Sequence, residues 1–345
     1  MNHFGSACLS LYLMCGIGAP LRADWRLDSQ ARTCLAENLA KRSFDEIPMA
    51  KGDAFALMDL HSGRVLWFRN RRVLARGSYQ PGSIFKIITA YVAFSNRKLD
   101  PEETYQCRGI KKTEGPKHSR VKCWLHSGHG PVNLSKALAL SCNLYFANAG
   151  LKVGSAAILK ASRQFGLGRS TGSDLGGEIS GWLPAVATVD EAARLGTGQG
   201  KEVLVTPIQM LSLVAAVAND GILYSPHIEN PGGEPTKVRG ELTDSAALRY
   251  IRDAMEEAST FGTGYAQRLK RLRLAGKTGT SAWLKKEWKT HAWYIGFAPY
   301  RTPLVALVVF IYDGQGSKEA AAVARKVMEA TYQAMTTCKV IKNQP

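Results

Sequence analysis

The chain has 345 residues, of which 45% are hydrophobic and 21% charged, a composition typical of a globular protein with enough apolar side chains for a large core. Its 45 Lys and Arg against 28 Asp and Glu give a formal net charge of +17, which favours an anionic partner: a nucleic acid, a membrane surface or an acidic polymer. Neither zinc-ligand spacing nor an RNA-binding aromatic motif accompanies the basic residues, so we expect no nucleic-acid partner.

An apolar segment at residues 4–21 opens the chain and is followed by Arg22 and Ala23. Its length and the small residues near its end fit a secretory signal peptide cleaved after Ala23. The run is also long enough for an uncleaved membrane anchor, although Pro20 weakens it as a spanning helix. We therefore expect residues 1–23 to be a signal peptide or an N-terminal anchor, with the choice left open. Either way, residues 24–345 form an exported domain in a periplasmic or other extracytoplasmic compartment.

Hydrophobic periodicity and turn residues predict the elements that follow. The first are a helix at 28–42, strands at 53–60 and 64–68, and a helix from Ser83 to about 94 that is apolar nearly all round. The middle is mostly helical, with helices at 134–141, 155–165, 206–219 and 245–258. The last third holds strands at 271–279, 291–297 and 304–312 and a closing helix at 317–337.

Strands at both ends of the chain with helices between them indicate an α+β fold. The N-terminal hairpin and the three C-terminal strands should share one antiparallel five-stranded sheet. The terminal helices would flank this sheet, and an all-helical lobe, about residues 80–260, would lie beside it. A functional site is expected in the crevice between the two lobes.

Five cysteines lie outside the apolar N-terminal segment, and none forms a Cys-x-x-Cys pair, so we expect neither a redox motif nor a metal site. Export permits disulfides. Cys107 and Cys123 flank a basic loop and should pair. Cys34 and Cys338 lie on the terminal helices and form a second predicted pair. Cys142 is interpreted as a packing residue.

Three short motifs occur in order: Ser83 with Lys86, Ser141 with Asn143, and Lys277 with the residues after it. A serine hydroxyl is a poor nucleophile unless a base removes its proton. Ser83 and Lys86 are three residues apart and share a helix face, so they can touch. Burial and the nearby charge of Lys277 would lower the pKa of Lys86 and make it a base. Ser141 would relay protons, and the amide of Asn143 would orient the substrate.

The third motif is assigned to binding. Lys277 and Thr278 can hold a substrate carboxylate, and Gly279 removes a side chain that would obstruct the substrate backbone. The backbone N–H groups of Thr280 and Ser83 could form an oxyanion hole. The pattern Ser-x-x-Lys is itself weak, since residues 95–98 also fit it, but that second copy lies among charged residues where its lysine stays protonated.

Together the three motifs resemble those of the penicillin-binding protein and serine β-lactamase superfamily. Further segments match the class B penicillin-binding proteins: QPGSIFK at 80–86, GHG at 128–130, SCNLYF at 141–146, FGLG at 165–168, GE at 177–178, GQG at 198–200, GKTGT at 276–280 and AWYIGFAP at 292–299. Between Ala23 and Ser83 there is too little chain for the pedestal domain that such proteins usually carry. The resemblance implies a bare transpeptidase domain with the mixed fold described above.

The resemblance also implies a function. The expected activity is that of a D,D-transpeptidase, which links peptidoglycan stem peptides ending in D-Ala-D-Ala through a Ser83 acyl-enzyme. Stem peptides, β-lactam antibiotics as covalent inhibitors and cell-wall synthesis proteins are the expected partners, and no cofactor or metal is required.

Three alternatives stay open. A D,D-carboxypeptidase would resolve the acyl-enzyme with water. A class D-like β-lactamase would share the first and third motifs, but its Ser-x-Val and Tyr-Gly-Asn signatures are not found at the matching places. A β-lactam sensor would need a transmembrane signalling region. Glu178 is interpreted as a structural hydrogen-bond acceptor and His129 as a loop residue, not as catalytic bases.

Overall fold

The computed structural model describes residues 27–42, 47–109, 121–185, 188–199, 203–228, 238–264, 272–283 and 286–341. The predicted signal or anchor at residues 1–23 lies outside the described residues. Within the described ranges, no helix combines the length and the apolar character that crossing a bilayer requires.

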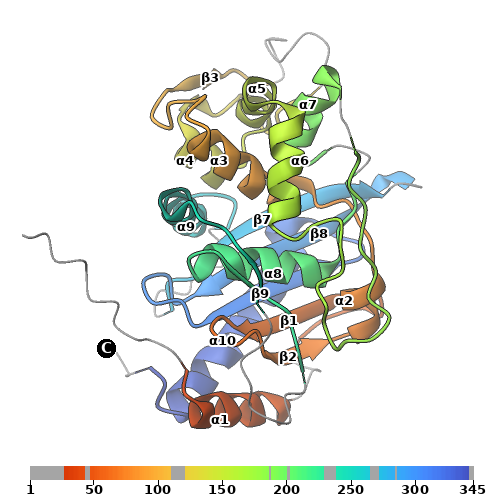
Figure 1. The fold of residues 1–345 in the computed structure, drawn as a ribbon, viewed down its shortest axis with the longest axis vertical. Coiled ribbons are helices and arrows are strands. Elements are labelled where there is room, and N and C mark those ends of the chain that lie inside the picture. The colour runs from red at the N-terminus through yellow and green to blue at the C-terminus, as the bar shows by residue number, and fades with distance from the viewer. Residues whose placement is uncertain are drawn as a thin grey trace, which may run out of the picture.

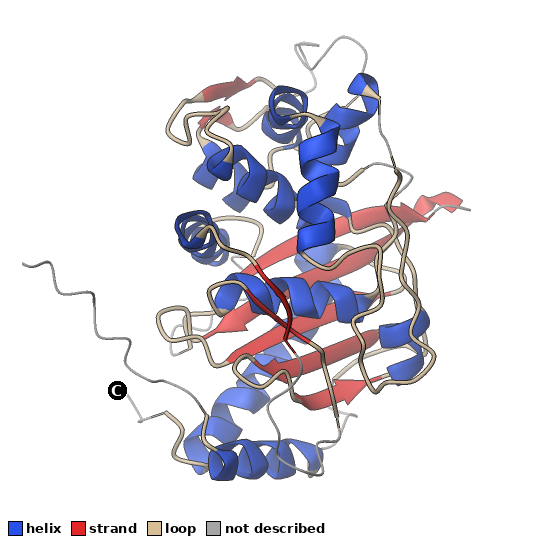
Figure 2. Cartoon of the chain, viewed as in Figure 1, coloured by secondary structure: helices blue, strands red, loops and turns tan. Residues whose placement is uncertain are grey.

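A five-stranded antiparallel sheet forms the centre of the fold, with strand order β2-β1-β9-β8-β7 (Figures 1 and 2). The strands span Ala54–Asp59 (β1), Val65–Arg69 (β2), Ala275–Trp283 (β7), Lys286–Ala298 (β8) and Val305–Ile311 (β9). β1 pairs with β9, so the two ends of the chain meet in one sheet. The predicted α+β fold is confirmed. The β7–β8 hairpin is longer than predicted, because pairing continues past the third motif.

Both faces of the sheet are buried, as the unbroken burial of β1 shows. Phe55 and Leu57 face one side and pack in a cluster with residues of α1 and α10. Ala56 and Met58 face the other side and pack in the cluster that includes α8. Figure 1 shows α8 lying across the near face of the sheet, with α1 and α10 at the opposite end of the molecule from the helical lobe. These helices span Ser29–Ala40 (α1), Pro207–Ala218 (α8) and Ala321–Thr337 (α10).

The two terminal helices are joined covalently. A disulfide links Cys34 and Cys338 with a Cα–Cα distance of 5.9 Å across a sequence separation of 304 residues. This is the second pair that the sequence predicted. Because it closes nearly the whole chain into a loop, it restricts the unfolded state strongly.

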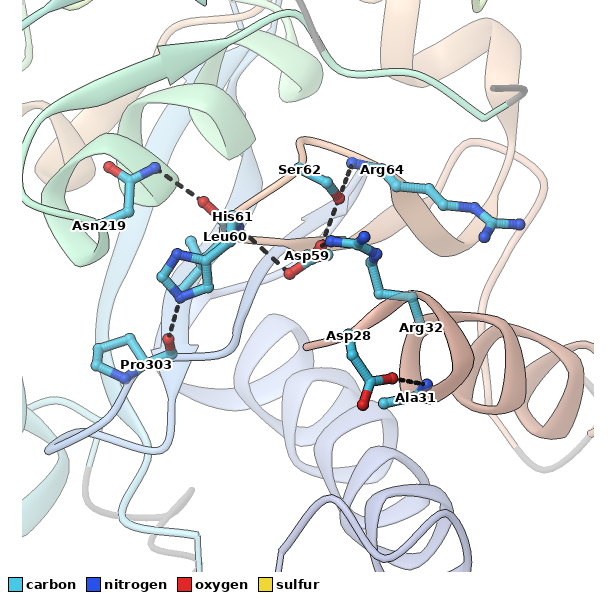
Figure 3. Close-up of polar contacts among 10 residues, drawn as sticks. All are labelled: Asp28, Ala31, Arg32, Asp59, Leu60, His61, Ser62, Arg64, Asn219 and Pro303. Carbon is cyan, nitrogen blue, oxygen red and sulfur yellow. Dashed lines mark hydrogen bonds and ion pairs between the residues drawn. The ribbon is translucent and has the colours of Figure 1, made fainter. Parts of the chain in front are cut away.

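The turn between β1 and β2 is tied to its surroundings by polar contacts (Figure 3). The buried carboxylate of Asp59 accepts hydrogen bonds from the Ser62 hydroxyl and the His61 backbone N–H, and Arg32 of α1 lies 3.4 Å from it. At the same turn, the side-chain amide of Asn219 donates to the Leu60 carbonyl at 3.0 Å. These contacts connect the hairpin with the terminal helix on one side and with the end of α8 on the other.

Helices make up most of the second lobe, which lies above the sheet in Figure 2. The remaining helices are Arg71–Arg76 (α2), Lys86–Ser95 (α3), Leu134–Ala139 (α4), Asn143–Val153 (α5), Ser155–Gln164 (α6), Val189–Thr197 (α7) and Ser245–Thr260 (α9). Two small hairpins pair Tyr105–Cys107 (β3) with Gly130–Val132 (β4), and Ile222–Tyr224 (β5) with Val238–Glu241 (β6).

Three of these helices, α2, α5 and α7, were not predicted. α2 is only six residues long, too short to show a helical period in the sequence. α5 starts after Cys142 without a side-chain cap, so no local signal marks where it begins. α7 does have a signal, because Thr188 and Glu191 form a capping box that is readable as Thr-x-x-Glu in the sequence.

Candidate active site

Ser83 lies in a tight 3-10 turn, Gly82–Phe85, that leads directly into α3. The turn packs against β7, and Gly82 adopts a positive φ of 55° at the point of contact. A Cβ atom on Gly82 would lie 2.4 Å from the carbonyl oxygen of Thr280. The chain entering the turn is held by Trp293, whose indole N–H donates to the Gln80 carbonyl at 2.9 Å. Sheet and helical lobe therefore meet at the serine.

Lys86 extends from the first turn of α3 into a fully buried position. Its Nζ lies 3.0 Å from Ser83 Oγ, 2.6 Å from Asn143 Oδ1, 2.8 Å from the Ser141 carbonyl oxygen and 3.2 Å from Ser141 Oγ. Burial lowers the pKa of Lys86 to about 7. An amine with that pKa can be neutral, and therefore basic, at ordinary pH.

The oxygens around Lys86 favour one arrangement of protons. Asn143 Oδ1 and the Ser141 carbonyl can only accept, and the amide orientation of Asn143 agrees with this because its Nδ2 donates to the Lys122 carbonyl at 2.9 Å. A neutral amine has two N–H groups and one lone pair. If the N–H groups serve the two carbonyl oxygens, the lone pair is left for a hydroxyl proton of Ser83 or Ser141.

Lys277 is also fully buried. Its Nζ donates to Ser141 Oγ at 2.9 Å and to the Thr278 carbonyl at 2.9 Å. Burial and the neighbouring Lys86 lower the pKa of Lys277 well below its usual value. In this arrangement the Lys277 amine contacts the Ser141 hydroxyl and has no exposed surface of its own. Ser141 Oγ lies between the two lysine nitrogens and can pass a proton from one to the other.

The remaining residues of the third motif divide into exposed and buried positions. Thr280 is exposed, and its Oγ1 accepts a hydrogen bond from the Gly316 N–H at 3.0 Å. Thr278 is nearly buried, and its hydroxyl donates to Thr263 Oγ1 at 2.8 Å. Thr263, which precedes β7, was missed in the sequence because no motif marks it. Of the two motif threonines, Thr280 is therefore the one that exposes its side chain.

Gly279 lies where β7 packs against the turn that carries Ser83. A Cβ atom there would lie 3.0 Å from Ile84 Cγ2 and 3.1 Å from the Pro81 carbonyl oxygen. The absent side chain therefore lets β7 approach the turn that carries Ser83.

Behind Ser141 and Asn143 lies a second group of polar side chains. The prediction that Cys107 and Cys123 form a disulfide is wrong, since both are free in the structure. Their sulfurs instead face His129, with Sγ–Nδ1 distances of 3.5 Å for Cys107 and 3.3 Å for Cys123. Cys142 joins them, and one ligand atom from each of the four residues lies within 4.8 Å of the others. The expectation of no metal-binding group overlooked this cluster, whose members are too widely and irregularly spaced to form a familiar motif.

The chain belongs to the family of the penicillin binding protein transpeptidase domain, whose model matches residues 53–329. Among curated proteins it is 31% identical over 263 residues to stage V sporulation protein D of Bacillus subtilis, covering 72% of this chain and 40% of that protein. It is 30% identical over 293 residues to the peptidoglycan D,D-transpeptidase MrdA of Acinetobacter baumannii, covering 75% of this chain and 43% of that protein. The chain thus spans less than half the length of these two relatives.

Solved structures agree on the fold. The transpeptidase domain of Burkholderia pseudomallei penicillin-binding protein 3 superimposes with a TM-score of 0.76 at 20% identity, over 92% of this chain and 97% of that one. Penicillin-binding protein 2 of Pseudomonas aeruginosa, solved with WCK 5153, superimposes with a TM-score of 0.71 at 25% identity, over 88% of this chain and 77% of that one.

The contact between Gly82 and β7 leads to a prediction. In Gly82→Ala, the new Cβ must displace the Thr280 carbonyl, so we expect slower acylation of Ser83 by a penicillin and a loss of about 1–3 kcal/mol in the free energy of unfolding. Gly154→Ala is the matched control, because Gly154 also has a positive φ, 86°, but nothing lies within 4 Å of its Cβ position. Labelling rates and urea unfolding measure both effects. Equal acylation rates in the two variants would contradict the proposed contact.

Proposed function

We propose that this chain is a D,D-transpeptidase that cross-links peptidoglycan stem peptides ending in D-Ala-D-Ala, and that Ser83 is the residue acylated by substrate and by penicillin. The observation that carries the proposal is the position of Lys86, a fully buried amine with a pKa lowered to about 7 and its Nζ 3.0 Å from Ser83 Oγ. Membership of the transpeptidase-domain family supports the same activity.

In the acylation step, neutral Lys86 accepts the Ser83 proton while Ser83 Oγ attacks the carbonyl carbon of the penultimate D-Ala. The backbone N–H groups of Ser83 and Thr280 stabilise the oxyanion. Cleavage of the peptide bond needs a proton on the leaving D-Ala nitrogen. Ser141 supplies it and is reprotonated from Lys86 or Lys277, since its Oγ lies 3.2 and 2.9 Å from their nitrogens. The substrate carboxylate is held by Thr278 and Thr280, with Lys277 behind them, and Asn143 orients the peptide.

In the second step, an amine of another stem peptide attacks the ester carbonyl, and Ser83 recovers its proton. Rapid hydrolysis would need an activated water on the open face of the ester. Glu178 does not offer this, because its carboxylate accepts hydrogen bonds from the backbone N–H groups of Thr171 and Ser173. Glu178 is thus a structural acceptor, as its sequence context indicated. The acyl-enzyme therefore waits for an amine, which favours transpeptidase over β-lactamase.

The proposal includes location and partners. The apolar segment at residues 4–21 supports export, by a signal or an anchor, to the compartment where stem peptides occur. A structure of penicillin-binding protein 2 from Helicobacter pylori is a complex with MreC. A cell-wall synthesis partner is accordingly proposed for this chain as well.

The experiment follows the fate of the acyl group. The protein is pulsed with a fluorescent penicillin, chased with unlabelled drug, and supplied separately with a D-Ala-D-Ala-terminated pentapeptide with or without a D-amino acid acceptor. We expect a label that persists for many minutes and exchange of the terminal D-Ala for the acceptor. Release of D-Ala at the same rate without acceptor would indicate a carboxypeptidase. Rapid turnover of nitrocefin, with the label lost within seconds, would indicate a β-lactamase.

A further inference from the structure

Four side chains from separate parts of the sequence converge behind the second motif. Cys107 ends β3, Cys123 and His129 lie between β3 and β4 in the sequence, and Cys142 precedes α5. The three cysteines are buried, with exposed fractions of 1%, 2% and 0%. Buried thiols and an imidazole that converge from four segments form a closed set of nitrogen and sulfur ligands, the donor set that Zn²⁺ prefers in structural sites.

The distances fit a tetrahedral ion. With Zn–S about 2.3 Å and Zn–N about 2.0 Å, tetrahedral angles put neighbouring sulfurs about 3.8 Å apart and sulfur and nitrogen about 3.5 Å apart. The Sγ–Nδ1 distances are 3.5 Å for Cys107 and 3.3 Å for Cys123, and all four ligand atoms lie within 4.8 Å of one another. A disulfide would require two of the sulfurs about 2.05 Å apart, and none of these three is bonded.

The cluster is built into the active-site wall. Cys142 lies between Ser141 and Asn143, whose Oγ and Oδ1 both contact Lys86. Cys123 lies on the opposing segment, and hydrogen bonds tie the two segments together on each side of the cysteines. On one side the Asn143 amide donates to the Lys122 carbonyl at 2.9 Å. On the other, the Trp124 indole donates to the Leu140 carbonyl at 3.2 Å.

Ser141 itself needs such support, because it is a non-glycine residue with a φ of +56°. A backbone conformation of this kind persists only where the surroundings over-determine it. Its carbonyl and hydroxyl both face the lysine nitrogens, so a small rotation at this residue would move two of the contacts around Lys86. A bond to the next residue, Cys142, would restrain that rotation.

We propose that Cys107, Cys123, His129 and Cys142 bind one Zn²⁺ tetrahedrally and that this ion holds the Ser141–Cys142–Asn143 segment in place against Lys86. The cysteines bind as thiolates and His129 through Nδ1. The ion takes no part in acyl transfer, and the four residues are positioning residues. The proposed metal site does not depend on the proposed transpeptidase activity. The proposed effect of the ion on acylation of Ser83 does rest on that activity.

Metal binding is tested first, without any activity assay. The full chain, purified in the presence of a chelator and a reductant that does not bind metals, is titrated with Zn²⁺ against a chromophoric zinc chelator and, separately, with Co²⁺. We expect one ion per chain, the intense visible bands of tetrahedral Co²⁺, a near-ultraviolet thiolate-to-cobalt band, and a higher melting temperature with zinc. A Co²⁺ spectrum like that of the octahedral ion in buffer, or zinc binding no stronger than to a variant lacking the ligands, overturns the site.

His129→Asn and His126→Asn form a matched pair, since His126 is three residues away and its side chain is exposed. We expect His129→Asn to weaken zinc affinity by about 10-fold or more, and His126→Asn to leave it unchanged. In Cys107→Ser, the thiolate-to-cobalt band should lose about a third of its intensity, since one of three sulfurs is gone. If that variant fails to fold, the wild-type cobalt spectrum and the histidine pair decide the question. Equal affinities in the two histidine variants contradict the ligand assignment.

The effect on the active site is tested by the rate of penicillin labelling at Ser83 with and without zinc. Removing the ion should slow labelling about tenfold or more, and adding zinc back should restore it, in wild type but not in His129→Asn. If zinc binds but the labelling rate does not change, the metal site is supported and its positioning role is contradicted. Absence of labelling in the zinc-loaded wild type contradicts the proposed transpeptidase, while the cobalt spectrum still reports on the metal site.

Discussion

Ser83→Ala should remove all covalent labelling by penicillin, because the side chain that forms the ester is absent. In the wild type, Ser83 Oγ lies 3.0 Å from the Nζ of Lys86. The variant should fold normally, since Ser83 is only partly buried and alanine is well tolerated in a helical turn. Fluorescent penicillin followed by gel electrophoresis and peptide mass spectrometry measures the loss.

The chain provides its own control for this experiment. Ser95 begins a second Ser-x-x-Lys pattern, and its lysine, Lys98, is exposed. That lysine is not buried against the serine as Lys86 is, so Ser95→Ala should label like the wild type. An adduct on Ser83→Ala, or loss of labelling in Ser95→Ala, would place the nucleophile elsewhere.

Lys86→Arg should reduce the acylation rate by about 10²- to 10⁴-fold, the contribution of a positioned general base. Arginine retains the positive charge but cannot give up its proton at working pH. In the wild type, burial lowers the pKa of Lys86 to about 7. The neutral form is the active one, so acylation should rise about tenfold per pH unit below pH 7 and level off above it.

The pH profile separates a missing base from a damaged fold. If Lys86→Arg retains any acylation, its rate should no longer change with pH near pH 7. A site that is only distorted would show the same dependence on pH at a lower rate. Lys98→Arg is the matched control at the second pattern and should keep both rate and profile. A wild-type profile without a step between pH 6 and 8, or a step retained in Lys86→Arg, would refute Lys86 as the base.

The features that could be predicted from the sequence are those that depend on neighbouring residues. Ser83 and Lys86 are three positions apart, and helix geometry alone brings them together. The hairpin of β1 and β2 follows from two apolar runs around a short turn. The helix α8 was recognisable because Thr206 and Pro207 mark its start, and the structure has the capping box there. Such features depend on short-range sterics and hydrogen bonds, which the sequence of a few residues contains.

The way in which distant segments meet could not be predicted from the sequence and is seen in the folded chain. Lys277 lies 136 residues from Ser141, and its burial against that hydroxyl depends on how β7 packs beside the helical lobe. The same packing brings the Cα of Gly279 close to Ile84, where a side chain would be in tight contact. The cysteines show the limit most clearly, since sequence proximity suggested pairing Cys107 with Cys123. The fold instead turns both sulfurs toward His129 and Cys142, because backbone direction, and not separation along the chain, determines which side chains converge.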